Sequence, residues 1–468
     1  MSNTMDDRAP SAPAEPEDHL RDDYALDARY VERVVDAADR GDQRRLAELL
    51  EGLHPADVAD LMGFLQAEYR DDVLAALRPD QIADVLSELD EDIREDVLDD
   101  LTPQQLADAV SELDSDDAAD IVEDLEADKR SAVLAAMPAE ERAAVESSLG
   151  YGEETAGRLM QREVMAAPQF WNVGQTIDHM RGQPDDLPEL FFDIYVVDPS
   201  NRPVGAVPVS ALLRCKRDMP LTELMEPVRE VEVHQDQEEV AYAFNKYHLI
   251  SAPVVDSSGR LVGQITVDDI VGVIQEETEE DILALAGVGD EGRDAGVFGS
   301  MRARLPWLAV NLLTAMLAAG VISAFEASIA QLVALAVLMP IVASLGGNAG
   351  TQALTVTVRG LALRELNASN AFRLVRRELM VAFLNGCVLA LLIGVAAGAW
   401  FRDPALGGVI GLAMVLNLIA AGLAGALVPL ALDRVGQDPA VSSSVFVTAV
   451  TDIIGFFVFL GLATIILL

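Results

Sequence analysis

The side chain with the most unusual chemistry lies where hydrocarbon is expected. Asp452 stands inside residues 443–467, an apolar segment long enough to cross a bilayer. A carboxylate near the centre of a spanning helix costs about 2.5–3.5 kcal/mol on insertion scales, and such residues usually face an aqueous path or a partner. No arginine lies at a similar depth in the sequence. We therefore interpret Asp452 as part of a polar pathway through the membrane.

A second apolar segment carries polar residues together with helix-weakening ones. Residues 340–352 read Pro-Ile-Val-Ala-Ser-Leu-Gly-Gly-Asn-Ala-Gly-Thr-Gln. Pro340 lacks a backbone donor, and Gly346 and Gly347 weaken a helix. Irregular backbone at membrane depth is tolerated only against protein or a water-filled cavity. The sequence therefore predicts a broken helix that forms the wall of an ion pathway.

The formal net charge of −44 is distributed very unevenly. Residues 1–300 hold 70 Asp and Glu against 24 Lys and Arg, whereas residues 301–468 hold 7 against 9. The acidic part favours cations and argues against nucleic acid as a partner, because phosphate binding needs clustered Lys and Arg. A generally acidic proteome would explain the bulk charge but not carboxylates at matched positions. Two cysteines and five scattered histidines suggest no disulfide framework and no catalytic constellation, so we expect no enzyme.

Five apolar segments qualify as membrane-spanning helices. They cover about residues 305–325, 329–357, 379–400, 407–432 and 443–467. Eight arginines flank the inner ends if the N-terminus is inside, and only Arg402 flanks an outer end. This predicts a protein of the cytoplasmic membrane with a cytosolic N-terminus and an extracytoplasmic C-terminus. Asn385 and Asn417 are candidates for hydrogen bonds between helices, and Gly394 and Gly398 for close helix packing.

The acidic soluble region begins with a tail and a repeat. Residues 1–25 are predicted to be a disordered acidic tail. Residues 26–157 contain a 24-residue repeat, in which Leu53-His-Pro, Leu77-Arg-Pro and Leu101-Thr-Pro recur. Proline at the first helical position, followed by apolar residues at helical spacing, predicts two short helices per repeat. We expect these helices to stack into a superhelical N domain.

A second duplication follows, and then an acidic helix. Residues 158–274 contain a 58-residue step, in which residues 194–205 and 252–263 each read as strand, turn, strand. Residues 275–300 hold a helix and a Gly-rich linker, with five acidic side chains among residues 276–281. Such a cluster is either a solvated face or a site for a divalent cation, and its place beside the membrane favours the cation.

This order of parts resembles the MgtE family of magnesium channels. Pro340 to Gln352 is similar to the family's second membrane helix, and Asp438-Pro-Ala followed by Thr451-Asp452 is similar to its fifth. The resemblance implies a multi-domain fold: an α-helical superhelical N domain, an α/β pair of cystathionine-β-synthase-type (CBS) domains, and five transmembrane α-helices within residues 301–468. It also implies a homodimer in the lipid bilayer with one pore for Mg2+, which closes when Mg2+ binds between the cytosolic domains.

The resemblance implies roles for individual residues as well. In the pore, Asp452 is expected to bind hydrated Mg2+, and further pore positions are Gly347, Asn348, Ser444 and Thr451. Regulatory Mg2+ ligands are expected at Asp116, Asp120, Asp269, Glu277, Glu280 and Asp281.

ATP or another adenine nucleotide is a further expected ligand of the CBS pair. Such pairs often bind nucleotides through a Gly-x-x-Thr/Ser-x-x-Asp pattern, which the second copy has as Gly263, Thr266 and Asp269. The first copy has Pro208 and Ala211 at the two polar positions, so at most one site is expected.

Other functions stay open on the residues alone. Co2+ or Mn2+ could be the cargo, since transition metals bind a given site more tightly than Mg2+, although no Cys or His lies near Asp452. A membrane-anchored CBS sensor without transport is a second alternative, against which the polar residues of the membrane segments count. A CBS-bearing chloride channel is disfavoured by the acidic pathway and by five spans.

Overall fold

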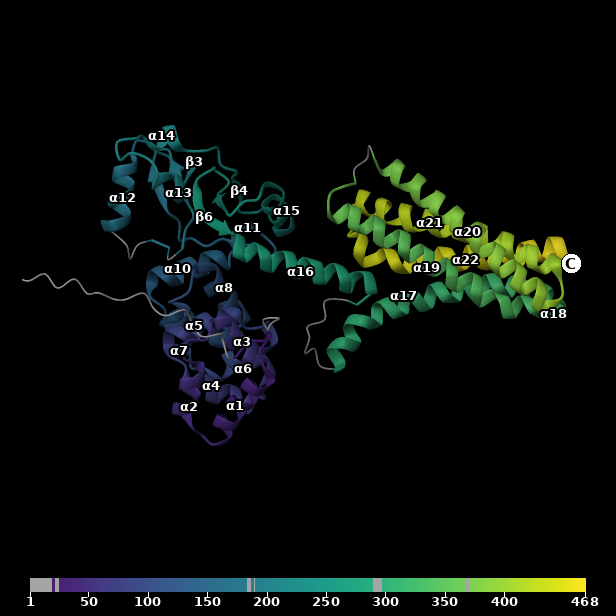
Figure 1. Cartoon of the computed structure of the whole chain (residues 1–468), viewed down its shortest axis with the longest axis horizontal. Coiled ribbons are helices and arrows are strands. Elements are labelled where there is room, and N and C mark those ends of the chain that lie inside the picture. Colours follow the sequence, from purple (N-terminus) through teal and green to yellow (C-terminus); the bar gives the residue numbers. More distant parts are fainter. Residues whose placement is uncertain (1–18, 22–24, 183–186, 189, 289–296, 367–369) are drawn as a thin grey trace, which may run out of the picture. The chain divides into compact units, whose positions relative to one another are not determined.

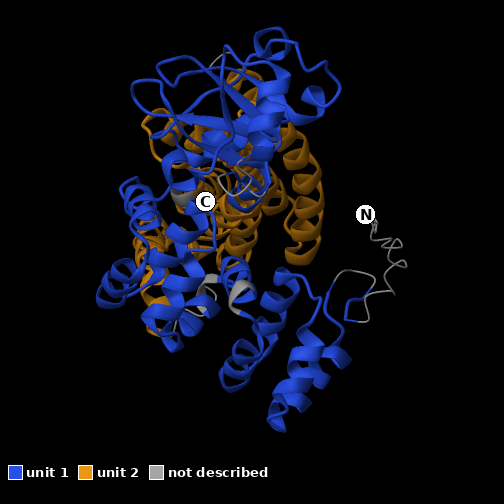
Figure 2. Cartoon of the chain, turned by 90° about the vertical axis from the view of Figure 1, so that its left-hand side faces the viewer, with its two compact units in different colours: residues 1–273 blue, residues 274–468 orange. Residues whose placement is uncertain are grey.

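The computed structural model describes residues 19–21, 25–182, 187–188, 190–288, 297–366 and 370–468. The chain forms two compact units, residues 1–273 and residues 274–468 (Figure 2). Unit 1 contains short helices and two small sheets, and unit 2 contains long apolar helices (Figure 1). This division confirms the predicted multi-domain chain.

The 24-residue repeat folds into pairs of short helices, as predicted. In the described part they are α1 (Ala28–Asp39), α2 (Gln43–Leu50), α3 (Pro55–Phe64), α4 (Ala67–Ala76), α5 (Pro79–Glu88), α6 (Glu91–Asp100), α7 (Pro103–Val110), α8 (Ser115–Asp124), α9 (Ala127–Ala136) and α10 (Ala139–Ser148). Pro55 and Pro103 occupy first helical positions, where a backbone donor is not needed. The buried faces of these helices form one continuous apolar core, which includes Leu61, Leu86 and Ile121.

The predicted tail, residues 1–25, lies largely outside the described residues. At its described end, Leu20 pairs with Leu26 in an isolated antiparallel bridge. His19 Nε2 lies 3.2 Å from Asp57 Oδ2 on α3. Folded structure therefore begins before residue 26.

The 58-residue duplication produces two sheets of the same topology. They consist of β1 (Ala166–Pro168), β2 (Asp193–Val197) and β3 (Pro203–Pro208), and of β4 (Val231–Glu232), β5 (Ser251–Val255) and β6 (Leu261–Thr266). In each sheet the first two strands are parallel and the last two antiparallel, and the register shifts at corresponding residues, Val196/Val197 and Val254/Val255. The helices beside them are α11 (Ala156–Leu159), α12 (Val173–Gly182), α13 (Val209–Leu212), α14 (Leu221–Leu224), α15 (Gln237–Tyr247) and α16 (Val267–Ala286).

Most described residues of unit 2 are helical, beginning with the second half of α16. The helices that follow α16 are α17 (Val297–Ala324), α18 (Glu326–Gln331), α19 (Ala334–Ala362), α20 (Ala371–Phe401), α21 (Pro404–Arg434) and α22 (Pro439–Leu467). Of the described helices α17 to α22, five are long and apolar enough to cross a membrane, which confirms the predicted number. The short α18 is the exception. The most buried of them is α21, which packs against α19, α20 and α22.

The predicted break in the second span is wrong. α19 runs without interruption from Ala334 to Ala362 and contains Pro340. Its glycines serve close packing instead: a Cβ at Gly350 would lie 2.6 Å from Val447 Cγ1 on α22. Small residues let membrane helices approach closely, and this packing outweighs their weak helix propensity.

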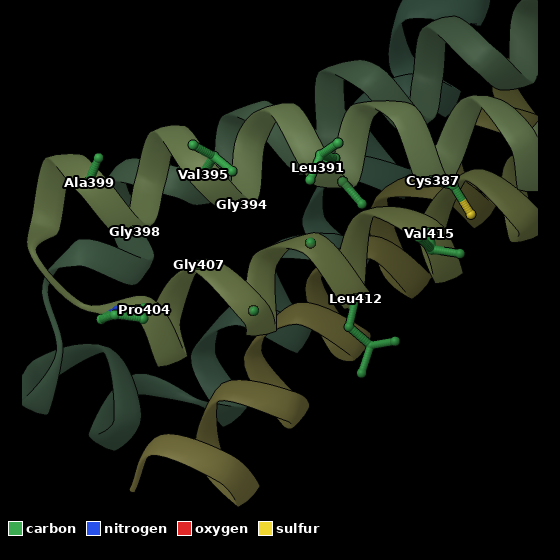
Figure 3. A pocket seen from close by; sticks show the side chains of 13 residues that line it. Cys387, Leu391, Gly394, Val395, Gly398, Ala399, Pro404, Gly407, Leu412 and Val415 are labelled. Atoms are coloured by element: carbon green, nitrogen blue, oxygen red, sulfur yellow. The ribbon is translucent and has the colours of Figure 1, made fainter.

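Glycines also bring α20 and α21 together, as proposed for Gly394 and Gly398. A Cβ at Gly394 would lie 2.9 Å from the Gly407 carbonyl oxygen, and a Cβ at Gly407 would overlap the Gly394 carbonyl. Figure 3 shows these glycines facing one another across the groove between the two helices. The groove is lined by apolar and small residues, so it is a packing feature of this helix pair.

Gly407→Ala should destabilise the membrane unit by about 1–3 kcal/mol, the usual size of an overpacking penalty. The neighbouring Gly408→Ala is the matched control, because nothing lies within 4 Å of a Cβ at that position. Thermal unfolding of the detergent-purified protein, followed by tryptophan fluorescence, should show a lower midpoint for Gly407→Ala only. Equal midpoints for the two variants would contradict the prediction.

Candidate functional site

Helices α19 and α22 carry the residues predicted for the membrane pathway, and they pack directly against each other (Figure 1). On α19, Asn348 is exposed, and a Cβ at Gly347 would meet nothing within 4 Å. On α22, Asp452 is half-buried, and no described residue gives its carboxylate a hydrogen bond or an ion pair. These two helices therefore hold a carboxylate and an amide that are available to an outside ligand.

Two other predicted pathway residues have roles inside the helix pair. Thr451 is fully buried, and its hydroxyl donates to the Thr448 carbonyl at 2.9 Å. Its methyl lies 3.4 Å from where a Cβ of Gly350 would stand. Ser444 is half-buried, and its carbonyl accepts the Thr448 hydroxyl at 2.9 Å. Within one chain, Thr451 thus joins α19 to α22 and does not face open space.

Four carboxylates of unit 1 form what we call the acidic cluster: Asp114, Asp116, Asp117 and Asp269. Asp116 is 8% exposed, and its Oδ1 is buried without a hydrogen-bond partner among the described residues. Burial raises the pKa of Asp116, and the charges of Asp269 and Asp117 raise it further. Burial raises the pKa of Asp117 to about 7, with Asp269 and Asp120 adding to the effect. The fold thus holds like charges together at a free energy cost that a bound cation would relieve.

The acidic cluster fits a hydrated Mg2+ better than a dehydrated one. Among the described residues, no three Asp, Glu, His or Cys side chains are placed to ligate one ion together. Mg2+ usually keeps several waters and binds proteins through one or two carboxylates. A pair such as Asp116 and Asp269, which α8 and the start of α16 contribute, meets this requirement.

Asp120, predicted to be a regulatory ligand, faces an arginine. Its Oδ1 lies 3.0 Å from Arg158 Nη2, and Arg158 also pairs with Glu123. The Arg158 side chain is only 5% exposed, whereas that of Asp120 is 57% exposed. A resident guanidinium therefore already neutralises part of the charge at this position, which makes Asp120 a weaker candidate ligand than Asp116.

Thr266 and Asp269, the predicted nucleotide pair, bind each other at the start of α16. The Thr266 hydroxyl donates to Asp269 Oδ2 at 2.6 Å, and the Thr266 backbone N–H lies 3.3 Å from the same oxygen. The bond from the Thr266 N–H to the Asp269 carboxylate is one half of a capping box. Burial raises the pKa of Asp269 to about 6, although these hydrogen bonds act in the opposite direction. The two residues of the pattern thus also have a structural role at the start of α16.

The acidic helix predicted after residue 274 is the second half of α16. One helix runs from Val267 to Ala286, so no break separates it from the last strand–helix unit of the CBS pair. Within unit 2, its Ala284 belongs to the same apolar cluster as Leu354 of α19 and Val447 of α22. This end of α16 is therefore part of the apolar packing that includes both helices of the candidate pathway.

The predicted regulatory residues of α16 differ in their surroundings. Asp281 is half-buried, and burial raises its pKa, with the charges of Asp438 and Glu277 adding to the effect. Asp438 caps α22, where its Oδ1 accepts the Ala440 N–H at 2.8 Å. Glu277 is half-buried and Glu280 is exposed. Asp281 thus places negative charge beside the start of the helix that carries Asp452.

Sequence reasoning missed several of these groups. Asp114 and Asp117 flank Asp116 in the sequence, and the run of acidic residues alone could have indicated them. No local sequence pattern indicated the role of Arg158, because its partners lie far from it in the sequence. Glu378, which is buried at 8% exposure in α20, lies just outside the predicted span of residues 379–400.

Comparisons with known proteins agree with this division into parts. The profile of the MgtE family, described as a divalent cation transporter, matches residues 339–462, that of the MgtE intracellular N domain matches residues 53–154, and that of the CBS domain matches residues 221–276. The magnesium transporter MgtE of Enterococcus faecalis is 35% identical over 69% of this chain and 72% of its own length. The MgtE proteins of Bacillus subtilis and Thermus thermophilus are 33% and 34% identical, over 71% and 70% of this chain and 74% and 73% of theirs.

Proposed function

Because the chain belongs to the MgtE family of divalent cation transporters, we propose that it carries Mg2+ across the membrane along α19 and α22. Its five apolar helices make it an integral membrane protein. The proposal depends above all on Asp452, whose carboxylate stands in an apolar span with no partner among the described residues. Such a group can bind Mg2+ through its water shell, since Mg2+ dehydrates reluctantly and conduction needs binding that also permits release.

The direct test is ion uptake by proteoliposomes that contain the purified wild-type protein. Uptake of Mg2+ above that of protein-free vesicles supports the proposal. Faster uptake of Co2+ or Mn2+ than of Mg2+ would favour the alternative cargo. If properly folded protein takes up none of the three ions, the membrane-anchored sensor is the better description.

The acidic cluster supports a second part of the proposal, in which Mg2+ closes the pathway. Without bound cations, the carboxylates of α8 repel Asp269 at the start of α16. Mg2+ would neutralise them and favour the arrangement in which these elements are packed together. Since α16 continues to the helices of the candidate pathway, a change at its start can bias its far end.

The raised pKa values predict that Mg2+ and protons compete at the acidic cluster. A carboxyl group whose folded pKa is raised binds more protons in the folded state, so stability falls as the pH rises from near 4 towards the folded value. Those values are about 7 for Asp117 and about 6 for Asp269. Without Mg2+, the full-length protein should therefore unfold at a lower temperature at pH 8 than at pH 6.

Added Mg2+ should raise the unfolding temperature more at pH 8 than at pH 6, because at pH 6 protons already neutralise part of the cluster. Thermal unfolding in detergent at both pH values checks this expectation. The variant Asp116→Asn with Asp117→Asn should lose most of the pH difference. A Mg2+ effect of equal size at both pH values in the wild type would count against the cluster as the site.

We further propose that the transporter is a homodimer with a cytosolic N-terminus. Five helices per chain rarely enclose a pore alone, and a two-fold dimer is the simplest closure. The excess of arginines at one set of helix ends supports the orientation. The molar mass of the detergent-solubilised protein, measured by light scattering, tests the dimer. Protease added to intact cells tests the orientation, and we expect the protease to spare residues 1–300.

Adenine nucleotide binding by the CBS pair is a separate part of the proposal. Only the second CBS copy has the Thr266 and Asp269 pattern, and these residues already satisfy each other as a helix cap. Equilibrium dialysis with ATP decides the question, and binding that Thr266→Val leaves unchanged would place the nucleotide elsewhere.

A further inference from the structure

A buried amide of α21 lies between the two helices of the candidate pathway. Asn417 is fully buried, and its Nδ2 donates to the Val342 carbonyl of α19 at 2.9 Å. Its Oδ1 is buried and has no hydrogen-bond partner in the part of the chain that the structure describes. A buried acceptor without a partner costs folding free energy, so hydrogen bonding between helices does not by itself account for this amide.

Two glycines on opposite sides form the space that the Asn417 amide fills. A Cβ at Gly346 of α19 would overlap Asn417 Nδ2, and its three nearest atoms all belong to Asn417. A Cβ at Gly455 of α22 would lie 2.9, 3.0 and 3.1 Å from Asn417 Nδ2, Oδ1 and Cγ. These nearly equal distances show that the amide lies flat against α22, while its Nδ2 edge meets α19.

The two glycines lie within one helical turn of the candidate pathway residues. At about 100° per residue, Asn348 points about 200° away from Gly346, which places it on the opposite side of α19. Asp452 precedes Gly455 by three residues, so it points only about 60° away from Gly455 on α22. The Asn417 amide therefore contributes to the spacing and rotation of α19 and α22 near Asn348 and Asp452, together with the direct contacts of Gly350 with Val447 and Thr451.

We infer that Asn417 is a positioning residue of the cation pathway: its amide, packed between Gly346 and Gly455, helps to set the spacing of Asn348 and Asp452. This inference rests on the proposed function, since it assumes that these two residues contact the ion. Asn417 itself does not need to touch the ion. Its effect on transport should therefore appear as altered ion binding by the pathway, and not only as lost stability.

The test is a double-mutant cycle on the full-length protein in proteoliposomes. Gly346→Ala should lower the maximal Mg2+ uptake rate by about tenfold or more, which is about 1.4 kcal/mol in the barrier. It should also change the half-saturating Mg2+ concentration. Gly346→Ala combined with Asn417→Ala should transport better than Gly346→Ala alone, because removing the amide makes room for the new methyl group.

Two controls separate positioning from general damage. Gly320→Ala places the same methyl on α17, where nothing lies within 4 Å of a Cβ, and should behave as wild type. Asn385→Ala removes an exposed amide from α20 and should leave the half-saturating concentration unchanged. Uptake is normalised to folded protein measured by size-exclusion chromatography.

The possible outcomes distinguish this inference from the proposed function. Wild-type uptake that Asp452→Asn abolishes, together with an unchanged half-saturating concentration in Gly346→Ala and Asn417→Ala, would overturn the positioning role alone. Strictly additive losses in the double variant would also overturn it. Wild-type protein that carries no Mg2+ would overturn the proposed function, and the positioning role with it.

Discussion

Asp452→Asn should abolish Mg2+ uptake by proteoliposomes while leaving the protein folded. Asparagine keeps the size of the side chain and removes only the negative charge. Two unit charges 4 Å apart attract by about 4 kcal/mol at an effective dielectric constant of about 20, and the divalent ion of the pathway interacts more strongly. Since 1.4 kcal/mol is a factor of ten, uptake should fall by more than about a hundredfold. A fluorescent Mg2+ indicator inside the proteoliposomes measures this uptake.

Asp403→Asn is the matched control for this prediction. Asp403 caps α21, where its Oδ1 accepts the N–H groups of Ala405 at 2.9 Å and Leu406 at 3.2 Å. Asparagine caps a helix as well as aspartate does, so this variant should transport as wild type. Unchanged uptake in Asp452→Asn would remove Asp452 from the pathway, and with it the main support for transport along α19 and α22.

Asp116→Ala combined with Asp120→Ala should leave the channel open at Mg2+ concentrations that close the wild type. Coupling between distant sites is commonly worth 1–3 kcal/mol, so the half-closing Mg2+ concentration should rise by about fivefold or more. The structure adds that most of this effect should come from Asp116, because Asp120 is paired with Arg158 at 3.0 Å. Mg2+ uptake measured against increasing Mg2+ on the side of unit 1 tests the double and single variants.

Asp128→Ala serves as the control for the regulatory variants. Asp128 is an exposed carboxylate of α9 in the same domain, and it does not belong to the acidic cluster. It should leave the half-closing concentration unchanged, which excludes a general effect of reduced negative charge. A double variant that closes at the wild-type concentration would show that neither Asp116 nor Asp120 is a ligand.

The mistaken expectation for residues 340–352 shows a limit of local reasoning. Helix propensity is a weak guide to structure, and Pro340, Gly346 and Gly347 together predict a break only for an isolated segment. In the folded chain, Gly346 accommodates the Asn417 amide, and Gly350 accommodates Val447. The same small side chains that weaken a lone helix allow close packing between neighbours, so α19 stays continuous.

The elements of this protein follow from local features of its amino-acid sequence. The repeats of 24 and 58 residues predict the short helices and both sheets, because helix starts and strand–turn–strand units depend on residues close together in the chain. The length of the apolar segments predicts five spans, because bilayer thickness sets how many residues a spanning helix needs. Asp452 is also conspicuous in the sequence, because a carboxylate is rare within an apolar span.

The partners of these side chains, in contrast, depend on the packing of the whole chain. Arg158 neutralises Asp120, whereas Asp116 faces Asp269 and keeps an unpaired oxygen. Asn417 reaches the Val342 carbonyl across 75 residues of sequence. Charge, burial and hydrogen bonding depend on distances in space, and residues far apart in the chain carry no local pattern that records those distances.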